Sequence, residues 1–256
     1  MRYICSVAHR KEALVTALRR WFGGFIVASC ASAAIVTQAL HAQAPLATRS
    51  YQVTSFDKIA AAGPNRVIVH VGGRPAVTAE GPNETLDRME VVVERDELQI
   101  RPRREPAGFG RERMEPATFT VTVPRLVAAS LAGSGDMRVD RTDADRFGAS
   151  VAGSGHLEIG ALRVNRVTLG MAGSGTLTAR GSAGEATVSV AGSGTVDARG
   201  VSSRTASVTI AGSGNAELSA QGTAHVSVVG SGNAEIFGRA HCTLTRIGSG
   251  RARCNA

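Results

Sequence analysis

The sequence predicts an all-β protein built as a solenoid, a parallel β-helix, and three observations carry that prediction. The tripeptide Gly-Ser-Gly occurs seven times at intervals of 18 to 20 residues, apolar and polar residues alternate on both sides of each copy, and the apolar positions recur from copy to copy. A repeat this short buries its apolar face only against neighbouring repeats. We therefore expect one coil for each repeat, with the coils stacked along an axis.

Two strands are predicted in each repeat. After Gly-Ser-Gly, apolar residues such as Leu157 and Ile159 alternate with polar residues such as His156 and Glu158. Before it, Ser or Thr stands between two apolar columns, as in residues 188–190. A period of two is typical of a strand with one buried face. An antiparallel meander or sandwich is the competing arrangement, and the recurrence of residue type in each column favours the solenoid.

The Gly-Ser-Gly copies are predicted to form the bends between these strands. Glycine adopts positive φ without a steric penalty, which suits a bend. The serines recur in seven equivalent copies, whereas a nucleophile needs one serine with its own base. We expect their hydroxyls to bond backbone groups at the bend.

The segment before the repeats is predicted to form the first turns of the same domain. Gly72-Gly73 and Gly81-Pro82-Asn83 are turn signals, and residues 101–116, rich in Arg, Glu and Pro, indicate a mobile surface loop. Alternating or β-branched runs predict strands at 66–71, 76–80, 89–94, 98–101 and 117–123.

The N-terminus resembles an export signal. A basic segment that ends in Arg19-Arg20 precedes a long uncharged apolar run, and small residues follow at Ala39, Ala42 and Ala44. The predicted organisation is a signal peptide over 1–42, a linker over 43–50 and one domain over 51–256. The alternatives are an uncut anchoring helix, twin-arginine export and a lipoprotein signal processed at Cys30.

Charge and hydropathy exclude several classes of protein. Without residues 1–42, 24 basic and 20 acidic residues remain, which is not the concentrated charge of a nucleic-acid-binding surface. No second apolar run approaches 18 residues, so a multi-spanning membrane protein is excluded. Contact with a membrane is expected only through the signal segment or a lipid on Cys30.

Motifs for catalysis and cofactors are absent from the sequence. It contains no nucleophile elbow, zinc-protease motif, phosphate loop or dinucleotide fingerprint. The four histidines after residue 42 have no ligand-like spacing to cysteines or acids. We therefore expect no enzyme activity, no metal and no cofactor, and a polysaccharide-active β-helix enzyme is the least favoured alternative.

One outward column of the repeats is acidic. Asp197, Glu217 and Glu235 occupy the same position in three consecutive repeats, and Asn215 and Asn233 lie in the adjacent outward column. Stacked like charges repel each other, so either solvent screens these carboxylates or a cation lies between them. The calcium-loop spacing is missing, which favours solvated carboxylates in a polar surface ladder.

Two cysteines, Cys242 and Cys254, lie in the last repeat. Both fall in inward columns, and disulfides persist in exported proteins. We predict a Cys242–Cys254 bridge that closes the end of the solenoid, where a cap is needed. Arg246 replaces an apolar residue in its column, which is consistent with the core ending at this coil.

The chain resembles the head GIN domain of putative auto-transporter adhesins over residues 51–256. The likeness is carried by residues 56–59 (Phe-Asp-Lys-Ile), by 81–100 with its ending Glu-Leu-Gln-Ile, by the strand 121–126 and by the seven repeats. The resemblance implies an exported, right-handed β-helix in the periplasm, the outer membrane or at the cell surface. It implies adhesin-like binding of a surface ligand or envelope protein. The alternative from another class is a structural envelope protein that self-associates into homo-oligomers.

Overall fold

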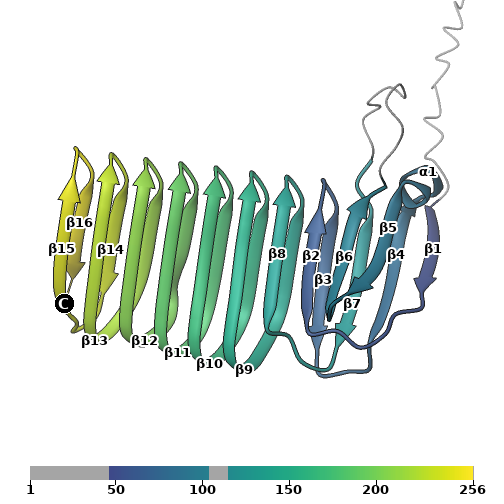
Figure 1. The fold of residues 1–256 in the computed structure, drawn as a ribbon, viewed down its shortest axis with the longest axis horizontal. Helices are drawn as coiled ribbons and strands as arrows, with labels where there is room; N and C mark the ends of the chain where they lie inside the picture. Colours follow the sequence, from purple (N-terminus) through teal and green to yellow (C-terminus); the bar gives the residue numbers. More distant parts are fainter. Residues whose placement is uncertain (1–45, 104–114, 256) are drawn as a thin grey trace, which may run out of the picture. The chain divides into compact units, whose positions relative to one another are not determined.

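The repeats form five long strands that stack in parallel, one coil each (Figure 1). The computed structural model describes residues 46–103 and 115–255, all within a unit that spans residues 43–256. Gly173 lies beside Gly153 on one side and Gly192 on the other, so the Gly-Ser-Gly copies stack in register. The parallel solenoid is confirmed, and the antiparallel alternative is excluded for the repeats. The long strands are β9 (Asp136–Gly153), β10 (His156–Gly173), β11 (Thr176–Gly192), β12 (Thr195–Gly212) and β13 (Asn215–Gly230).

Shorter elements flank this stack on both sides. At the C-terminal end the strands are β14 (Asn233–Phe237), β15 (His241–Ile247) and β16 (Arg251–Asn255). Before the repeats lie β1 (Leu46–Tyr51), β2 (Lys58–Ala62), β3 (Arg66–Val71), β4 (Ala76–Pro82), α1 (Asn83–Asp87), β5 (Met89–Glu94), β6 (Glu97–Pro102), β7 (Thr118–Val123) and β8 (Ala128–Gly133).

Each long strand bends and contributes to two layers. We call sheet I the layer of strand halves that precede Gly-Ser-Gly, and sheet II the layer of halves that follow it. Sheet I runs β5-β6-β2-β8, then the second halves of β9 to β13, then β15. Sheet II runs β1-β4-β7-β3, then the first halves of β9 to β13, then β14 and β16. In Figure 1 the chain ascends in the near layer, descends in the far layer and advances to the left, which is the expected right-handed winding.

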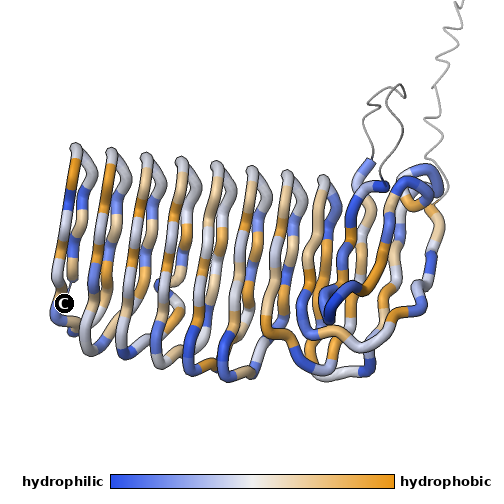
Figure 2. The backbone as a smooth tube through the Cα atoms, in the orientation of Figure 1, coloured by the Kyte–Doolittle hydropathy of each residue, from blue (hydrophilic) through white to orange (hydrophobic). Residues whose placement is uncertain are grey.

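The core lies between the two sheets. Leu157, Leu177 and Val196 occupy adjacent coils of one inward column, and each is fully buried. Phe147 is buried too, as its register predicts. Figure 2 shows the alternation of apolar and polar residues along the coils. Each such side chain contributes about 1.5–3 kcal/mol, so stability accumulates coil by coil.

The Gly-Ser-Gly corners are fastened by backbone groups. The first glycine of every corner has φ between +107° and +124°, a region that favours glycine. The carbonyl oxygen of Gly153 accepts the N–H groups of Ser174 at 2.9 Å and Gly175 at 3.0 Å, from the corner of the next coil. The prediction that serine hydroxyls hold the corners together is wrong, because main-chain N–H groups donate the hydrogen bonds between corners. The hydroxyls of Ser231 and Ser249 instead bond each other at 3.0 Å.

The N-terminal coils are not stacked in chain order. The coil of β2 and β3 lies between the coil of β6 and β7 and the coil that begins with β8. Residues 63–65 form its corner in place of Gly-Ser-Gly, with Gly63 at φ +102°. These four strands pair in parallel with one another and with β8 and β9, as expected for the first turns of the domain. β1, β4 and β5 instead pair antiparallel, and with α1 they close this end of the solenoid.

Several predicted boundaries change. Residues 46–50, assigned to the linker, belong to β1 and pair with β4, since the chain there completes the edge of sheet II. The turn predicted at Gly81-Pro82-Asn83 leads into α1. The signal peptide over 1–42, Cys30 and most of the loop predicted at 101–116 lie outside the described residues, while Arg101 and Pro102 belong to β6. Within the described ranges, no helix has the length and hydropathy to cross a membrane.

Candidate binding face

The outer surface of sheet II carries the polar columns that the sequence predicts. Asp197 lies beside Glu217, and Glu217 beside Glu235, on three consecutive coils. Asn215 lies beside Asn233, and the Asn233 amide Nδ2 donates to Asn215 Oδ1 at 3.0 Å. The register of the predicted ladder is therefore confirmed, and we call this surface the polar face.

The carboxylates of the polar face are paired with arginine rather than only solvated. The Arg199 guanidinium donates to Asp197 through Nε at 3.0 Å and through Nη2 at 2.8 Å. Its Nε also lies 2.8 Å from Glu217 Oε2 on the next coil. The expectation of solvated carboxylates is incomplete here, because one guanidinium contacts two rungs of the ladder and offsets one of their two negative charges.

This pairing shifts the ionisation of both partners. The hydrogen bonds from Arg199 lower the pKa of Asp197 below its ordinary value of 3.8. The same contacts raise the pKa of Arg199 above its ordinary value. Both groups stay charged at neutral pH, so the pair forms a fixed dipole on the surface.

A backbone irregularity places Arg199 between the two acids. The ladder between β12 and β13 shifts register after the pair of Ala198 and Leu218, and Ser219 Oγ donates to the carbonyl oxygen of Arg199 at 2.7 Å. Counting by two predicts that Arg180 and Arg199 stack in one column. That prediction is wrong, because Arg180 lies beside Gly200 after a register shift between β11 and β12.

Glu235 has a different partner. The amide Nδ2 of Asn255, from β16, donates to Glu235 Oε1. Arg253 lies beside Glu235 in the same column, so the acidic run ends at a basic residue. Asp197 and Glu217 thus share one guanidinium, whereas Glu235 is bound by a neutral side chain.

Toward β3 the polar face is hollowed. A shallow depression of about 470 Å³ opens between β3, β9 and β10. Inside it, Arg138 Nε donates to Glu158 Oε2 at 2.9 Å. Arg180 Nη1, from β11, lies 3.8 Å from Glu158 Oε1. The depression therefore offers guanidinium and carboxylate groups beside an apolar floor. Its lining residues are Arg66, Ile68, Asp136, Met137, Arg138, His156 and Glu158.

The opposite surface, on sheet I, is chemically different. One outward column there consists of small residues and hydroxyls in register, and Ser150 Oγ donates to Ser130 Oγ at 3.0 Å. Charged groups thus gather on one layer of the solenoid, and a flat hydroxyl-bearing surface covers the other. The column contains Ser130, Ser150, Gly170, Ser189, Thr209, Ser227 and Thr245.

The described residues contain no group of three or more His, Cys, Asp or Glu side chains arranged to hold a metal ion. The carboxylates of the acidic ladder instead contact the side chains of Arg199 and Asn255. What the polar face offers is hydrogen-bonding and ionic recognition by groups held about 4.8 Å apart from coil to coil.

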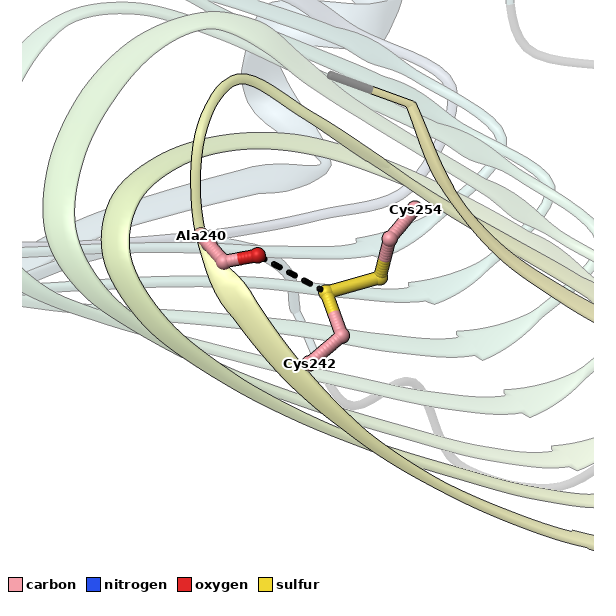
Figure 3. Close-up of a disulfide and its surroundings, with 3 residues drawn as sticks. All are labelled: Ala240, Cys242 and Cys254. Atoms are coloured by element: carbon pink, nitrogen blue, oxygen red, sulfur yellow. Dashed lines mark hydrogen bonds between the residues drawn. A yellow bond between two sulfur atoms is a disulfide. The ribbon is translucent and has the colours of Figure 1, made fainter.

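The predicted disulfide is present at the C-terminal end (Figure 3). Cys242 of β15 is bonded to Cys254 of β16, and their Cα atoms lie 6.6 Å apart. The bridge joins the last strand of sheet I to the last strand of sheet II. Cys242 Sγ also lies 3.7 Å from the carbonyl oxygen of Ala240.

Comparison with known families agrees with this architecture. Residues 55–240 match the sequence model of the family described as putative auto-transporter adhesin, head GIN domain. No curated protein matches the chain significantly in sequence.

Solved structures share the fold. A putative adhesin from Bacteroides fragilis is 22% identical with a TM-score of 0.76, over 82% of this chain and 97% of that one. A putative lipid binding protein from Parabacteroides distasonis is 21% identical with a TM-score of 0.67, over 82% and 97%. A putative adhesin from Parabacteroides merdae is 17% identical with a TM-score of 0.63, over 82% and 96%. At these identities the likeness concerns the fold alone.

Proposed function

Because the chain belongs to the family of putative auto-transporter adhesins with a head GIN domain, we propose that it is an exported, non-catalytic binding domain of the cell envelope. Its polar face engages the ligand, and the solenoid holds that face rigid. The observation that carries the proposal is the ladder in which Arg199 joins Asp197 and Glu217.

The polar face supports recognition better than chemistry. Fixed guanidinium, carboxylate and amide groups on consecutive coils match a ligand that is itself extended and polar, such as a glycan or a peptide segment. Arg199 retains an exposed side chain (56%) while it contacts both acids, so it can contact a ligand without leaving its partners. Rigid strands hold such groups more accurately than loops do.

Location is tested first by protease shaving of intact cells, with mass analysis of the mature N-terminus. We expect fragments of the solenoid from intact cells and an N-terminus near residue 43. Protection until the outer membrane is opened would contradict adhesion at the cell surface and leave a periplasmic binding role. A lipidated N-terminus at Cys30 would show that the domain is tethered.

The binding role is tested by screening the purified chain against immobilised envelope glycans and envelope proteins. Arg199→Ala removes the guanidinium shared by two coils, so we expect the affinity of any hit to fall about tenfold or more. Arg163→Ala is the matched control, because Arg163 is exposed on β10, two coils before the β12 coil that carries Arg199, and lies away from the ladder. A hit that binds both variants equally would mean that the polar face is not the binding surface.

A further inference from the structure

The two ends of the solenoid differ in how they are finished. At the N-terminal end, antiparallel strands and α1 cover the outermost coil. At the other end, among the described residues, β15 pairs only with β13 and β16 only with β14. The outer edges of both strands therefore present backbone N–H and C=O groups that no described strand satisfies, which is a template for another strand.

The interior of the last coil is also uncovered. Val208, Val226 and Leu244 occupy one inward column on adjacent coils. Val208 and Val226 are at most 2% exposed, whereas Leu244 is 45% exposed. The disulfide joins the two layers here but leaves this column open, so apolar surface lies directly beside the unpaired edges.

The same end is basic. Residues 238–255 contain four arginines and no Asp or Glu. Arg251 and Arg253 lie in the outward columns of the polar face, and Arg246 occupies an inward column beside Val228. Charged side chains on an edge strand block indiscriminate pairing, and two such ends repel each other. The fourth arginine is Arg239.

These charges argue against a second copy that approaches with the same end, and against residues 1–42 and 104–114 as occupants. A second copy that approaches with its own C-terminal end would bring four more arginines to the interface. Residues 1–42 carry five basic side chains and one acid, and residues 104–114 carry three arginines and two glutamates, so neither segment is acidic. The complementary occupant is a strand from another protein whose outward side chains are acidic.

We propose that the outer edge of β16 binds an extended acidic segment of a partner protein by strand addition. The segment alternates apolar and acidic side chains: the apolar ones cover the open end of the core near Leu244, and the acidic ones pair with Arg251 and Arg253. Main-chain hydrogen bonds supply affinity in this mode, and the alternate side chains supply specificity. The edge borders the polar face at Arg251 and Arg253, but its backbone groups lie outside the ladder around Arg199 that carries the proposed function.

The hydrogen bonds of β16 identify the residues that face the partner. The Arg251 N–H donates to Gly232 O at 2.9 Å, and Asn255 O accepts from the Gly238 N–H at 2.9 Å, so these residues face the body of the solenoid. Alternate residues of a strand direct their backbone groups to opposite sides. Ala252 and Cys254 therefore present their N–H and C=O groups to the open edge.

The test is fluorescence anisotropy of a labelled peptide, Asp-Val-Glu-Val-Glu-Val-Asp, titrated with the purified chain. The control peptide is Lys-Val-Lys-Val-Lys-Val-Lys, which has the same alternation and the opposite charge. We expect saturable binding of the acidic peptide alone, weakened by salt, and slowed amide exchange at Ala252 and Cys254 in the complex. Equal binding of the basic peptide would overturn the proposal.

Two variants separate charge from strand addition. Arg251→Glu with Arg253→Glu reverses both outward charges and should weaken binding roughly tenfold or more. Ala252→Pro removes one edge N–H without breaking a bond to β14, and should weaken binding with the charges intact. Arg163→Glu is the matched control and should bind as the parent does. Amide exchange in β10 to β12 verifies that each variant is folded.

Three further results would refute this assignment. The first is unchanged affinity in both β16 variants, and the second is an affinity equally reduced in Arg163→Glu. The third is a concentration-dependent mass of the chain alone together with protection of the β16 amides, because a second copy would then occupy the edge.

Discussion

Replacing a corner glycine tests whether the stacked corners hold the solenoid together. Gly173 has φ +118°, and a Cβ atom built there would lie 2.4 Å from Gly153 O and 3.1 Å from Gly153 C. Both atoms are backbone of the preceding coil, so no side chain can move aside. Gly173→Ala therefore introduces strain at positive φ and an overlap between two coils.

The expected loss of stability follows from two contributions. A non-glycine residue in this region of φ costs about 1–3 kcal/mol. Relief of the overlap separates the corner from Gly153 O, which accepts two N–H groups, and each bond contributes about 1 kcal/mol. The sum is roughly 3–5 kcal/mol. For a domain of this size the midpoint of thermal unfolding should fall by about 10 °C.

Gly148→Ala is the matched control in the same solenoid. Among the described residues, no heavy atom lies within 4 Å of a Cβ built at Gly148, and the φ of Gly148 is not positive. Alanine there should be neutral or stabilise by up to about 1 kcal/mol, since it restricts the unfolded chain. Thermal unfolding followed by circular dichroism measures both variants. Midpoints of the two variants within about 2 °C of each other would refute the role assigned to the corner.

Three further predictions concern the end coil, the polar face and the N-terminal edge. Reducing the Cys242–Cys254 bridge should fray the last coil, seen as faster amide exchange in β15 and β16 with β10 to β12 unchanged, and unchanged protection in β15 and β16 would contradict the capping role. The pKa of Asp197 is lowered in the folded chain, so its contribution to stability is present above its ordinary value of 3.8 and is lost as pH falls below it. Acid titration of the unfolding midpoint should therefore show a smaller decline in Asp197→Asn than in the parent, and identical profiles would argue against the pair with Arg199. The Tyr51 hydroxyl is buried without a partner among the described residues, so Tyr51→Phe should raise the free energy of unfolding by up to about 1 kcal/mol in a denaturant titration, whereas a decrease would reveal a bonding partner.

Counting along the sequence predicts the coils because each repeat has the same local environment. The inward position of Phe147, the rungs from Asp197 to Glu235 and the pairing of Cys242 with Cys254 all follow from a period of two and a repeat of 18 to 20 residues. These are translations along one axis, so an error in one coil does not spread to the others.

Counting fails where the backbone departs from that period. Arg199 lies in a register shift, so its place between two carboxylates is invisible to an alignment of columns. Asn65 stands where the later corners have glycine, and it is buried with its Oδ1 accepting the Ala117 N–H at 3.0 Å. No repeat signal marks that residue, because its partner lies 52 positions away in the chain.

The sequence by itself determined the solenoid, its repeat length, the two polar columns and the closing disulfide, because stacked copies must place equivalent residues side by side. The tertiary structure decided what those copies stack against. The insertion of the coil of β2 and β3 between two later ones, the antiparallel strands that close the N-terminal end and the exposed edge at β16 depend on contacts between segments without a common repeat. The ion pairing of the polar face was likewise decided in three dimensions, since a guanidinium pairs with the carboxylates that the folded backbone places within about 3 Å of it.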